Sequence, residues 1–271
     1  MASKFRIFLL NLAITSLTLL GTSATSDFLS ISAQASNFHA QADVESNNSL
    51  LHFQQGLSLL ESGKYEEAIE SFDRAIETQP NFPGAWVLRG GALVKLEKYS
   101  EAIESVDKAI EIQPDFPEVW NNRGDALVKL GKYSEAIESF DKAIEIQLDF
   151  PEAWNNRGDA LVGLEKYPEA IKSFDKAIEI QPDFPEAWNN RGVALFKLDK
   201  YQEAIASADK AIEFRHDFHH AWVLRGLANM SLGNKPKAMN DLQKAAQFAQ
   251  QNNDIESYQT IQMLLRFIQT P

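Results

Sequence analysis

The chain has 271 residues, and its 26 lysines and arginines stand against 38 aspartates and glutamates, a formal net charge of −12 at pH 7. Nucleic acid and anionic membrane surfaces bind a dense basic face, so this acidic balance argues against both as ligands. The lack of cysteine excludes disulfide bonds, thiolate metal sites and a cysteine nucleophile.

Residues 1–35 have the pattern of a secretory signal peptide. Lys4 and Arg6 precede the uncharged run Ile7–Leu20, and small residues follow it. The triplet Ala-Gln-Ala at 33–35 has the form of a signal-peptidase site. The sequence therefore predicts an exported protein, either periplasmic or secreted.

Two alternatives remain open for this segment. Thr-Ser-Ala at 22–24 is a second candidate cleavage site, closer to the apolar run. No charge interrupts residues 7–26, so an uncleaved membrane anchor also fits, although an apolar core of about 14 residues is shorter than the ~20 that span a bilayer. Residues 36–48 are polar and lack periodicity, and we expect them to form a flexible linker.

Residues 49–252 consist of near copies of one 34-residue sequence, which indicates a repeat architecture. The six repeats are 49–82, 83–116, 117–150, 151–184, 185–218 and 219–252. All five tryptophans fall at the fourth place of a repeat, namely Trp86, Trp120, Trp154, Trp188 and Trp222. Glycine occupies the eighth place of every repeat, and alanine occupies the twentieth and the twenty-seventh.

Each repeat is predicted to form two antiparallel helices. In the fourth repeat, apolar residues recur over 153–164 with helical rather than strand spacing, and a second helix is expected over 168–180. Glycine inside a helix costs about 1 kcal/mol relative to alanine, so a glycine in every repeat needs a structural reason. We expect Gly158 and Ala170 to lie where the two helices cross, with the ring of Trp154 beside them.

Gly-Lys-Tyr at residues 63–65 and 131–133 invites comparison with a phosphate-binding loop. Six residues rather than four separate each segment from the preceding glycine, and no serine or threonine follows the lysine. These segments are therefore predicted to be turns between helices.

Tryptophan, glycine, alanine, an aromatic residue, alanine and proline at this 34-residue spacing resemble the tetratricopeptide repeat family. The resemblance implies an all-α fold, an α-solenoid of six tandem helix-turn-helix repeats in which each repeat is covered by its neighbours. Residues 253–271 continue a helical apolar stripe, and terminal helices in proteins of this kind imply that they form a C-terminal capping helix over the sixth repeat. The alternative is that this stripe recruits a helix of a partner.

The resemblance also implies a partner-binding groove, because in this family the first helices of successive repeats line a concave surface that holds a peptide. By the family's spacing, the second, fifth, ninth and twelfth places face it. These places hold Glu118, Asn121, Asp125, Val128, Glu152, Asn155, Asp159, Val162, Glu186, Asn189, Val193 and Phe196. Asparagine side chains both donate and accept hydrogen bonds, so they can bind a peptide backbone, and the carboxylates would favour a cationic segment.

Two observations limit this interpretation of the groove. The clamp of some chaperone-binding relatives needs lysine or arginine at the second and fifth places, where this chain has glutamate and asparagine. In a purely structural alternative, Glu118 and Glu152 only complement helix N-termini, an effect worth ~0.3–1 kcal/mol each.

Arginine recurs at the seventh place of five repeats and aspartate at the twenty-fifth. The arginines are Arg89, Arg123, Arg157, Arg191 and Arg225, and the aspartates are Asp73, Asp107, Asp141, Asp175 and Asp209. The favoured interpretation is a ladder of Arg–Asp pairs that ties adjacent helices, with the arginine stems packed on tryptophan. The alternative is a row of guanidinium groups that binds anions.

The segment 216–220 reads His-Asp-Phe-His-His where other repeats have Pro-Asp-Phe-Pro-Glu. Imidazoles this close could bind a transition metal or respond to pH. Sequence drift at an exposed turn between repeats is the favoured interpretation, so neither a metal site nor a cofactor is predicted.

The sequence contains no HExxH, GxSxG or GxGxxG motif, and its carboxylates recur at the repeat spacing, as on a solvated face. We therefore expect no enzyme activity. The predicted function is that of an exported protein–protein interaction scaffold that binds a peptide or protein segment, in the assembly or maturation of a complex. The alternative is a targeting or regulatory subunit of an envelope enzyme whose catalytic part lies on another chain.

Overall fold

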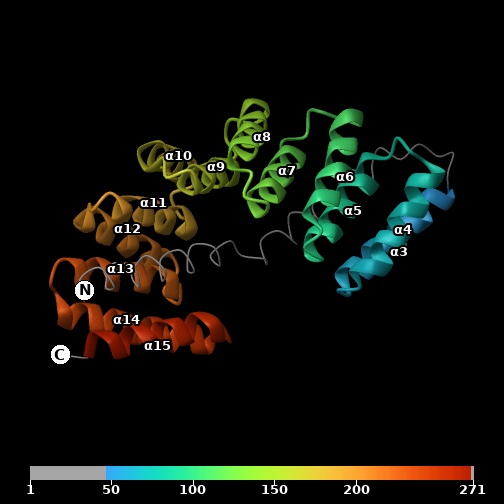
Figure 1. The fold of residues 1–271 in the computed structure, drawn as a ribbon. Coiled ribbons are helices and arrows are strands. Elements are labelled where there is room, and N and C mark those ends of the chain that lie inside the picture. The colour runs from blue at the N-terminus through green and yellow to red at the C-terminus, as the bar shows by residue number, and fades with distance from the viewer. Residues whose placement is uncertain (1–46, 270–271) are drawn as a thin grey trace. The chain divides into compact units, whose positions relative to one another are not determined.

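The computed structural model describes residues 47–269, and every regular element in that range is a helix (Figure 1). The helices are α3 (Asn47–Glu61), α4 (Tyr65–Thr78), α5 (Pro83–Lys95), α6 (Tyr99–Ile112), α7 (Pro117–Lys129), α8 (Tyr133–Ile146), α9 (Pro151–Gly163), α10 (Tyr167–Ile180), α11 (Pro185–Lys197), α12 (Tyr201–Phe214), α13 (His219–Ser231), α14 (Lys235–Gln251) and α15 (Ile255–Gln269). The predicted all-α fold of tandem helical hairpins with an additional C-terminal helix is confirmed.

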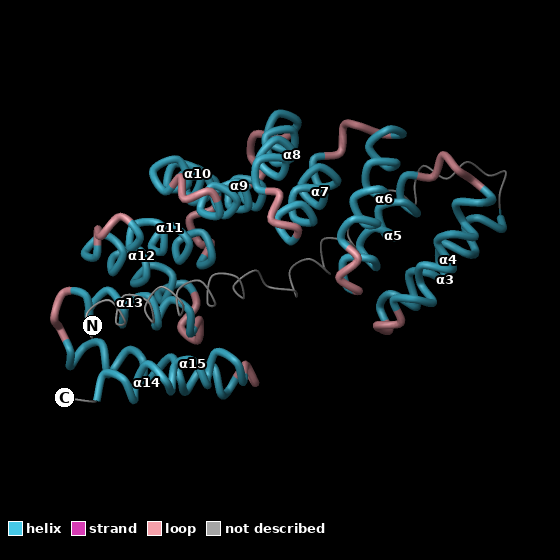
Figure 2. Tube along the Cα trace, in the orientation of Figure 1, coloured by secondary structure: helices cyan, strands magenta, loops and turns pink. Residues whose placement is uncertain are grey.

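The described residues divide into two compact units at Leu164 and Glu165. The N-terminal unit holds α3–α9 and the C-terminal unit holds α10–α15. Within the N-terminal unit each helix packs on the next, and the first helices of neighbouring repeats also touch, α3 on α5, α5 on α7 and α7 on α9. Short turns join the two helices of each hairpin (Figure 2).

The eighth-place glycines allow the two helices of a hairpin to approach closely. A Cβ built on Gly124 would lie 2.5 Å from Cε1 of Phe140, and one on Gly56 would lie 2.6 Å from Cε1 of Phe72. The crossing expected at these glycines is therefore present. In these two repeats, however, the ring that faces the glycine is the phenylalanine of the second helix and not the tryptophan of the first.

The tryptophans instead fix the turn between repeats. The indole Nε1 of Trp120 donates to the carbonyl oxygen of Pro114 at 2.8 Å, and the other four tryptophans bond six residues back at 2.8–3.1 Å. Trp222 is buried, whereas the first four remain half-buried. Their rings therefore stabilise the entry to each first helix as well as the apolar core.

The turns inside the hairpins share one left-handed residue. It is glycine in three of them, with φ of +73° at Gly63, +71° at Gly131 and +79° at Gly233. The same place holds Glu97 and Glu165, each at φ +59°. The prediction that the Gly-Lys-Tyr segments are interhelical turns is confirmed.

The C-terminal unit is built around one apolar core. This core joins α11–α14 to α15, which contributes Ile261 and Leu265, and it includes Trp222 and Leu242. Ile261 is completely buried, so α15 covers the apolar face of the last hairpin. Stable exposure of that face to water would be costly, which explains why the helical pattern continues beyond residue 252.

The predicted signal peptide (1–35), the alternative anchor (7–26) and nearly all of the predicted linker (36–48) lie outside the described residues. Among the helices that the structure describes, none is both long and apolar enough to cross a membrane.

Candidate functional site

Arginine side chains link each hairpin to the one before it. Nε of Arg123 donates to Oδ1 of Asp107 at 2.7 Å, and its Nη1 donates to Oγ of Ser139 at 2.8 Å. Ser139 in turn donates to the carbonyl oxygen of Glu135 at 3.1 Å. One guanidinium therefore joins the second helix of the preceding repeat to the second helix of its own.

All five predicted Arg–Asp pairs are present. They are Arg89–Asp73, Arg123–Asp107, Arg157–Asp141, Arg191–Asp175 and Arg225–Asp209, at 2.5–2.7 Å. Arg225 also binds the buried Asp241, at 2.7 Å. The predicted ladder is confirmed, and these guanidinium groups are engaged with carboxylates rather than arranged as an anion-binding row.

The α7–α9 face, defined as the predicted groove residues of these two helices, belongs wholly to the N-terminal unit. Asn121 and Asn155 are buried at 8 % and 6 % exposure. Nδ2 of Asn156 donates to Oδ1 of Asn121 at 3.2 Å and to Oδ1 of Asp125 at 3.0 Å. The amide at the sixth place, absent from the predicted site, therefore bonds one repeat to the next.

The carboxylates and valines of the α7–α9 face are more accessible than its two asparagines. Glu152 is exposed, while Glu118, Asp125 and Asp159 are half-buried, as are Val128 and Val162 at the far end of each helix. Burial raises the pKa of Asp159 to about 7, and Lys129 opposes this only partly. The face thus combines fixed amides with a row of acidic groups, two on each helix.

The predicted groove residues of the C-terminal unit are more enclosed. Asn189, Val193 and Phe196 are 6–7 % exposed, and the last two belong to the apolar core. Oε1 of Glu186 forms an ion pair with Nη2 of Arg215 at 2.7 Å. In this unit the predicted places are therefore largely occupied by contacts within the protein.

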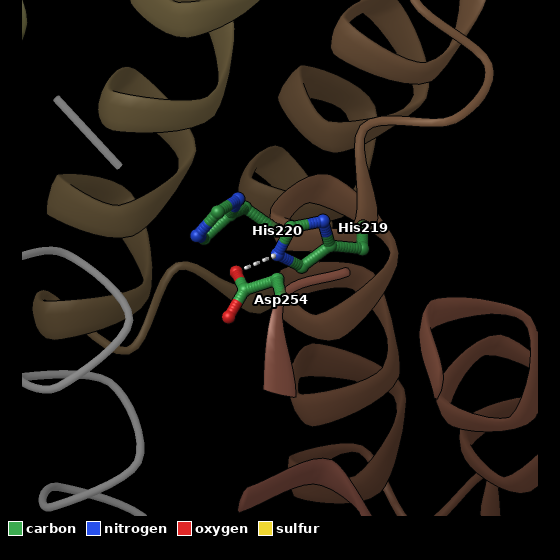
Figure 3. Close-up of side chains that lie close together, drawn as sticks. All are labelled: His219, His220 and Asp254. Carbon is green, nitrogen blue, oxygen red and sulfur yellow. Dashed lines mark ion pairs between the residues drawn. The ribbon is translucent and has the colours of Figure 1, made fainter. Parts of the chain in front are cut away.

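A cluster of His219, His220 and Asp254 lies at the start of α13 (Figure 3). Nε2 of His219 lies 3.2 Å from Oδ2 of Asp254, and the two imidazole ring centroids are 4.0 Å apart. His216 points elsewhere, since its ring meets the rings of Trp222 and Phe248 edge-on. His219 is only 6 % exposed, so the expectation of an exposed turn is wrong at this residue.

Asp254 was not predicted as part of this cluster, because it lies 34 residues beyond His220 in the turn before α15. Its Oδ1 accepts a hydrogen bond of 3.0 Å from the backbone N–H of Ser257, as a helix N-cap does. An aspartate directly before an apolar helical stripe is the N-cap signal that the sequence contains. The cap holds the carboxylate in place while Oδ2 faces His219.

The histidines of the cluster are electrically neutral near pH 7. Burial lowers the pKa of His220 to about 3, and the neighbouring His219 contributes to this shift. Burial also lowers the pKa of His219, although Asp254 acts in the opposite direction. For Asp254, burial alone would raise the pKa, but the hydrogen bond from Ser257 and the two histidines keep it below its ordinary value.

Sequence profiles of one family match successive parts of the chain. A TPR repeat profile matches residues 124–165 and 158–199, and tetratricopeptide repeat profiles match 53–117, 106–138, 185–218 and 219–252. Residues 53–252 are tetratricopeptide repeats. No curated protein matches the chain in sequence.

Several solved tetratricopeptide structures share the fold. PilW, described as a widely conserved type IV pilus biogenesis factor, has a TM-score of 0.69 at 23% identity over 80% of this chain and 99% of PilW. MamA from Desulfovibrio magneticus RS-1 has a TM-score of 0.60 at 21% identity. The match covers 64% of this chain and 98% of the MamA chain. YrrB, described as having an unusual peptide-binding site, has a TM-score of 0.55 at 24% identity. The match covers 69% of this chain and 96% of YrrB.

Proposed function

We propose that the protein is an exported, non-catalytic scaffold that binds a cationic segment of another protein on the α7–α9 face, in the assembly or maturation of a complex. The observation that carries the proposal is the acidic row Glu118, Asp125, Glu152 and Asp159 on two helices in direct contact. A pKa of about 7 leaves Asp159 only partly ionised at neutral pH, so the other three carboxylates carry most of the charge. Export is inferred from the signal-peptide pattern of residues 1–35.

The fixed placement of Asp125 supports a binding role. Asn156 fixes Asp125 by its hydrogen bond of 3.0 Å, and α7 and α9 are each joined to the preceding repeat by an arginine. Groups fixed before binding lose little conformational freedom when a partner arrives, so less of the interaction energy is spent on ordering them. A lysine- or arginine-bearing segment would complement their charge.

The descriptions of two structural relatives agree with this class of function. PilW is called a biogenesis factor and YrrB a protein with a peptide-binding site. At these identities the likeness concerns the fold, so the partner of the present protein is inferred only from the chemistry of its own face.

Photo-crosslinking from position 152 tests the proposal directly. A benzophenone residue replacing the exposed Glu152 should capture a partner in cell-envelope extracts, and one replacing the exposed Glu138 on α8 should not. Capture of a single enzyme would instead favour a targeting subunit over a scaffold. Equal capture from both positions, or none from position 152, would overturn the proposed face.

Charge reversal provides the second test. Asp125→Lys together with Asp159→Lys should reduce binding of a lysine-rich peptide at least tenfold, because repulsion replaces attraction. Glu104→Lys together with Glu138→Lys, at exposed positions of α6 and α8, is the matched control for net charge. N-terminal sequencing of the exported protein tests the other half of the proposal, with Ser36 or Thr25 expected as the first residue.

A further inference from the structure

Three buried nitrogens of the histidine cluster lack a well-directed hydrogen bond. Nδ1 and Nε2 of His220 and Nε2 of His219 are inaccessible to solvent and make no hydrogen bond within the described part of the chain. Asp254 is close enough to His219 for an ion pair but is not directed as a hydrogen-bond acceptor. Burying polar atoms in this way is costly unless something satisfies them.

We propose that His219, His220 and Asp254 bind one divalent transition-metal ion of the zinc class, which ties the start of α13 to the turn before α15. The three donor atoms already lie within 4.8 Å of one another. In Figure 3 the carboxylate of Asp254 lies below the two imidazole rings, and a dashed line marks its ion pair with His219.

The distances suit such an ion. In tetrahedral coordination with bonds of about 2.0–2.1 Å, neighbouring ligand atoms are separated by roughly 3.3 Å. Nε2 of His219 and Oδ2 of Asp254 are 3.2 Å apart. The remaining donor, a nitrogen of His220, lies within 4.8 Å of the other two ligand atoms and has no hydrogen bond to lose on joining the set. A fourth position would remain for water.

The donor set selects the class of metal. Two imidazoles and one carboxylate suit zinc, nickel, copper or cobalt, whereas magnesium and calcium prefer sites made of oxygen ligands alone.

The neighbouring charges act in both directions. The guanidinium of Arg215 disfavours positive charge on both histidines. Its own charge is partly offset by the ion pair with Glu186 at 2.7 Å, and it stacks over the ring of Phe218 at 3.9 Å. Asp217 and Asp254 favour a cation at His219. The carboxylate of Asp254 therefore attracts a cation to the cluster, and the guanidinium of Arg215 opposes this attraction.

Calorimetry and thermal unfolding of the full chain, prepared without a histidine tag, test the proposal with zinc chloride. We expect one site per chain and a higher Tm with zinc but not with magnesium chloride. Asp254→Asn retains the helix cap, because asparagine caps as well as aspartate, and should bind zinc at least tenfold more weakly.

Two further variants separate metal binding from folding. His220→Leu should abolish the zinc-induced rise in Tm without lowering the Tm of the metal-free protein, since leucine leaves no buried polar atom unpaired. His216→Gln, the control from the same segment, should bind zinc as the parent does. Absence of zinc binding to the parent, or equal binding by the parent, Asp254→Asn and His220→Leu, would overturn the proposal.

Discussion

Nε of Arg123 donates to Oδ1 of Asp107 at 2.7 Å, and the two residues belong to different repeats. The arginine side chain is 24% exposed and the aspartate 42%, so the pair is only partly shielded from solvent. Because the same guanidinium also bonds Ser139, its loss would leave two polar groups without their partner. The repeat-to-repeat junction therefore depends on a polar contact as well as on apolar packing.

Arg123→Ala should lower the free energy of unfolding by about 1–2 kcal/mol, mainly because Asp107 and Ser139 lose a shared donor. Urea denaturation of the variant measures this. Lys142→Ala is the matched control, since Lys142 pairs with Glu145 at 2.6 Å on an exposed helix surface and such pairs contribute little. Equal losses in the two variants would contradict a junction role for the arginine.

Gly124→Ala should destabilise the third repeat by about 1–3 kcal/mol. The added methyl would lie 2.5 Å from Cε1 of Phe140, and overpacking of this size outweighs the better helix propensity of alanine. Adding Phe140→Val should recover part of the loss, because the second repeat already pairs Gly90 with Val106. Thermal unfolding of the two single variants and the double variant measures the coupling, and strict additivity would contradict the close approach.

Glu97→Gly should stabilise the protein by about 1 kcal/mol. Glu97 has φ +59°, a left-handed conformation that costs a residue with a Cβ roughly 1–2 kcal/mol. Glycine avoids this cost, but it loses more backbone entropy on folding, which offsets part of the gain. Gly131→Ala is the reciprocal variant, at φ +71° with no atom within 4 Å of the new methyl, and should destabilise by a similar amount. Changes of the same sign in both variants, measured by denaturation, would rule out backbone strain as the cause.

The stability of the protein should fall between about pH 4 and pH 7 because of Asp159. Burial raises its pKa to about 7, so in this window the folded chain keeps a proton that the unfolded chain has released. The folded state then binds more protons than the unfolded one, and the free energy of unfolding decreases as pH rises. Asp159→Asn cannot titrate and should show a flatter profile than the parent.

Urea denaturation at pH 5 and pH 8 checks this sign. Glu138→Gln, at an exposed carboxyl on α8, should follow the parent at both values. If Asp159→Asn also follows the parent, the buried carboxyl is not the source of the pH dependence.

Much of the fold and of the arginine ladder could be predicted from the sequence, because each repeat makes the same contacts with its neighbours. The 34-residue period, the two-helix hairpins and the pairing of Arg123 with Asp107 all follow from a sequence pattern that recurs in successive repeats. The candidate face was less predictable. Its positions were located by the family's spacing. The burial of Asn121 and its hydrogen bond from Asn156, however, depend on how α9 packs against α7.

The sequence alone thus determined the helices, their repeat and the polar pairs between repeats, since these depend on local periodicity and nearest neighbours. Tertiary structure decided that Phe140 rather than a tryptophan fills the space at Gly124, and that Asp254 meets His219. The reason is physical: side chains compete for space only once two helices have packed, and a single contact at the end of the chain has no repeated copy to reveal it.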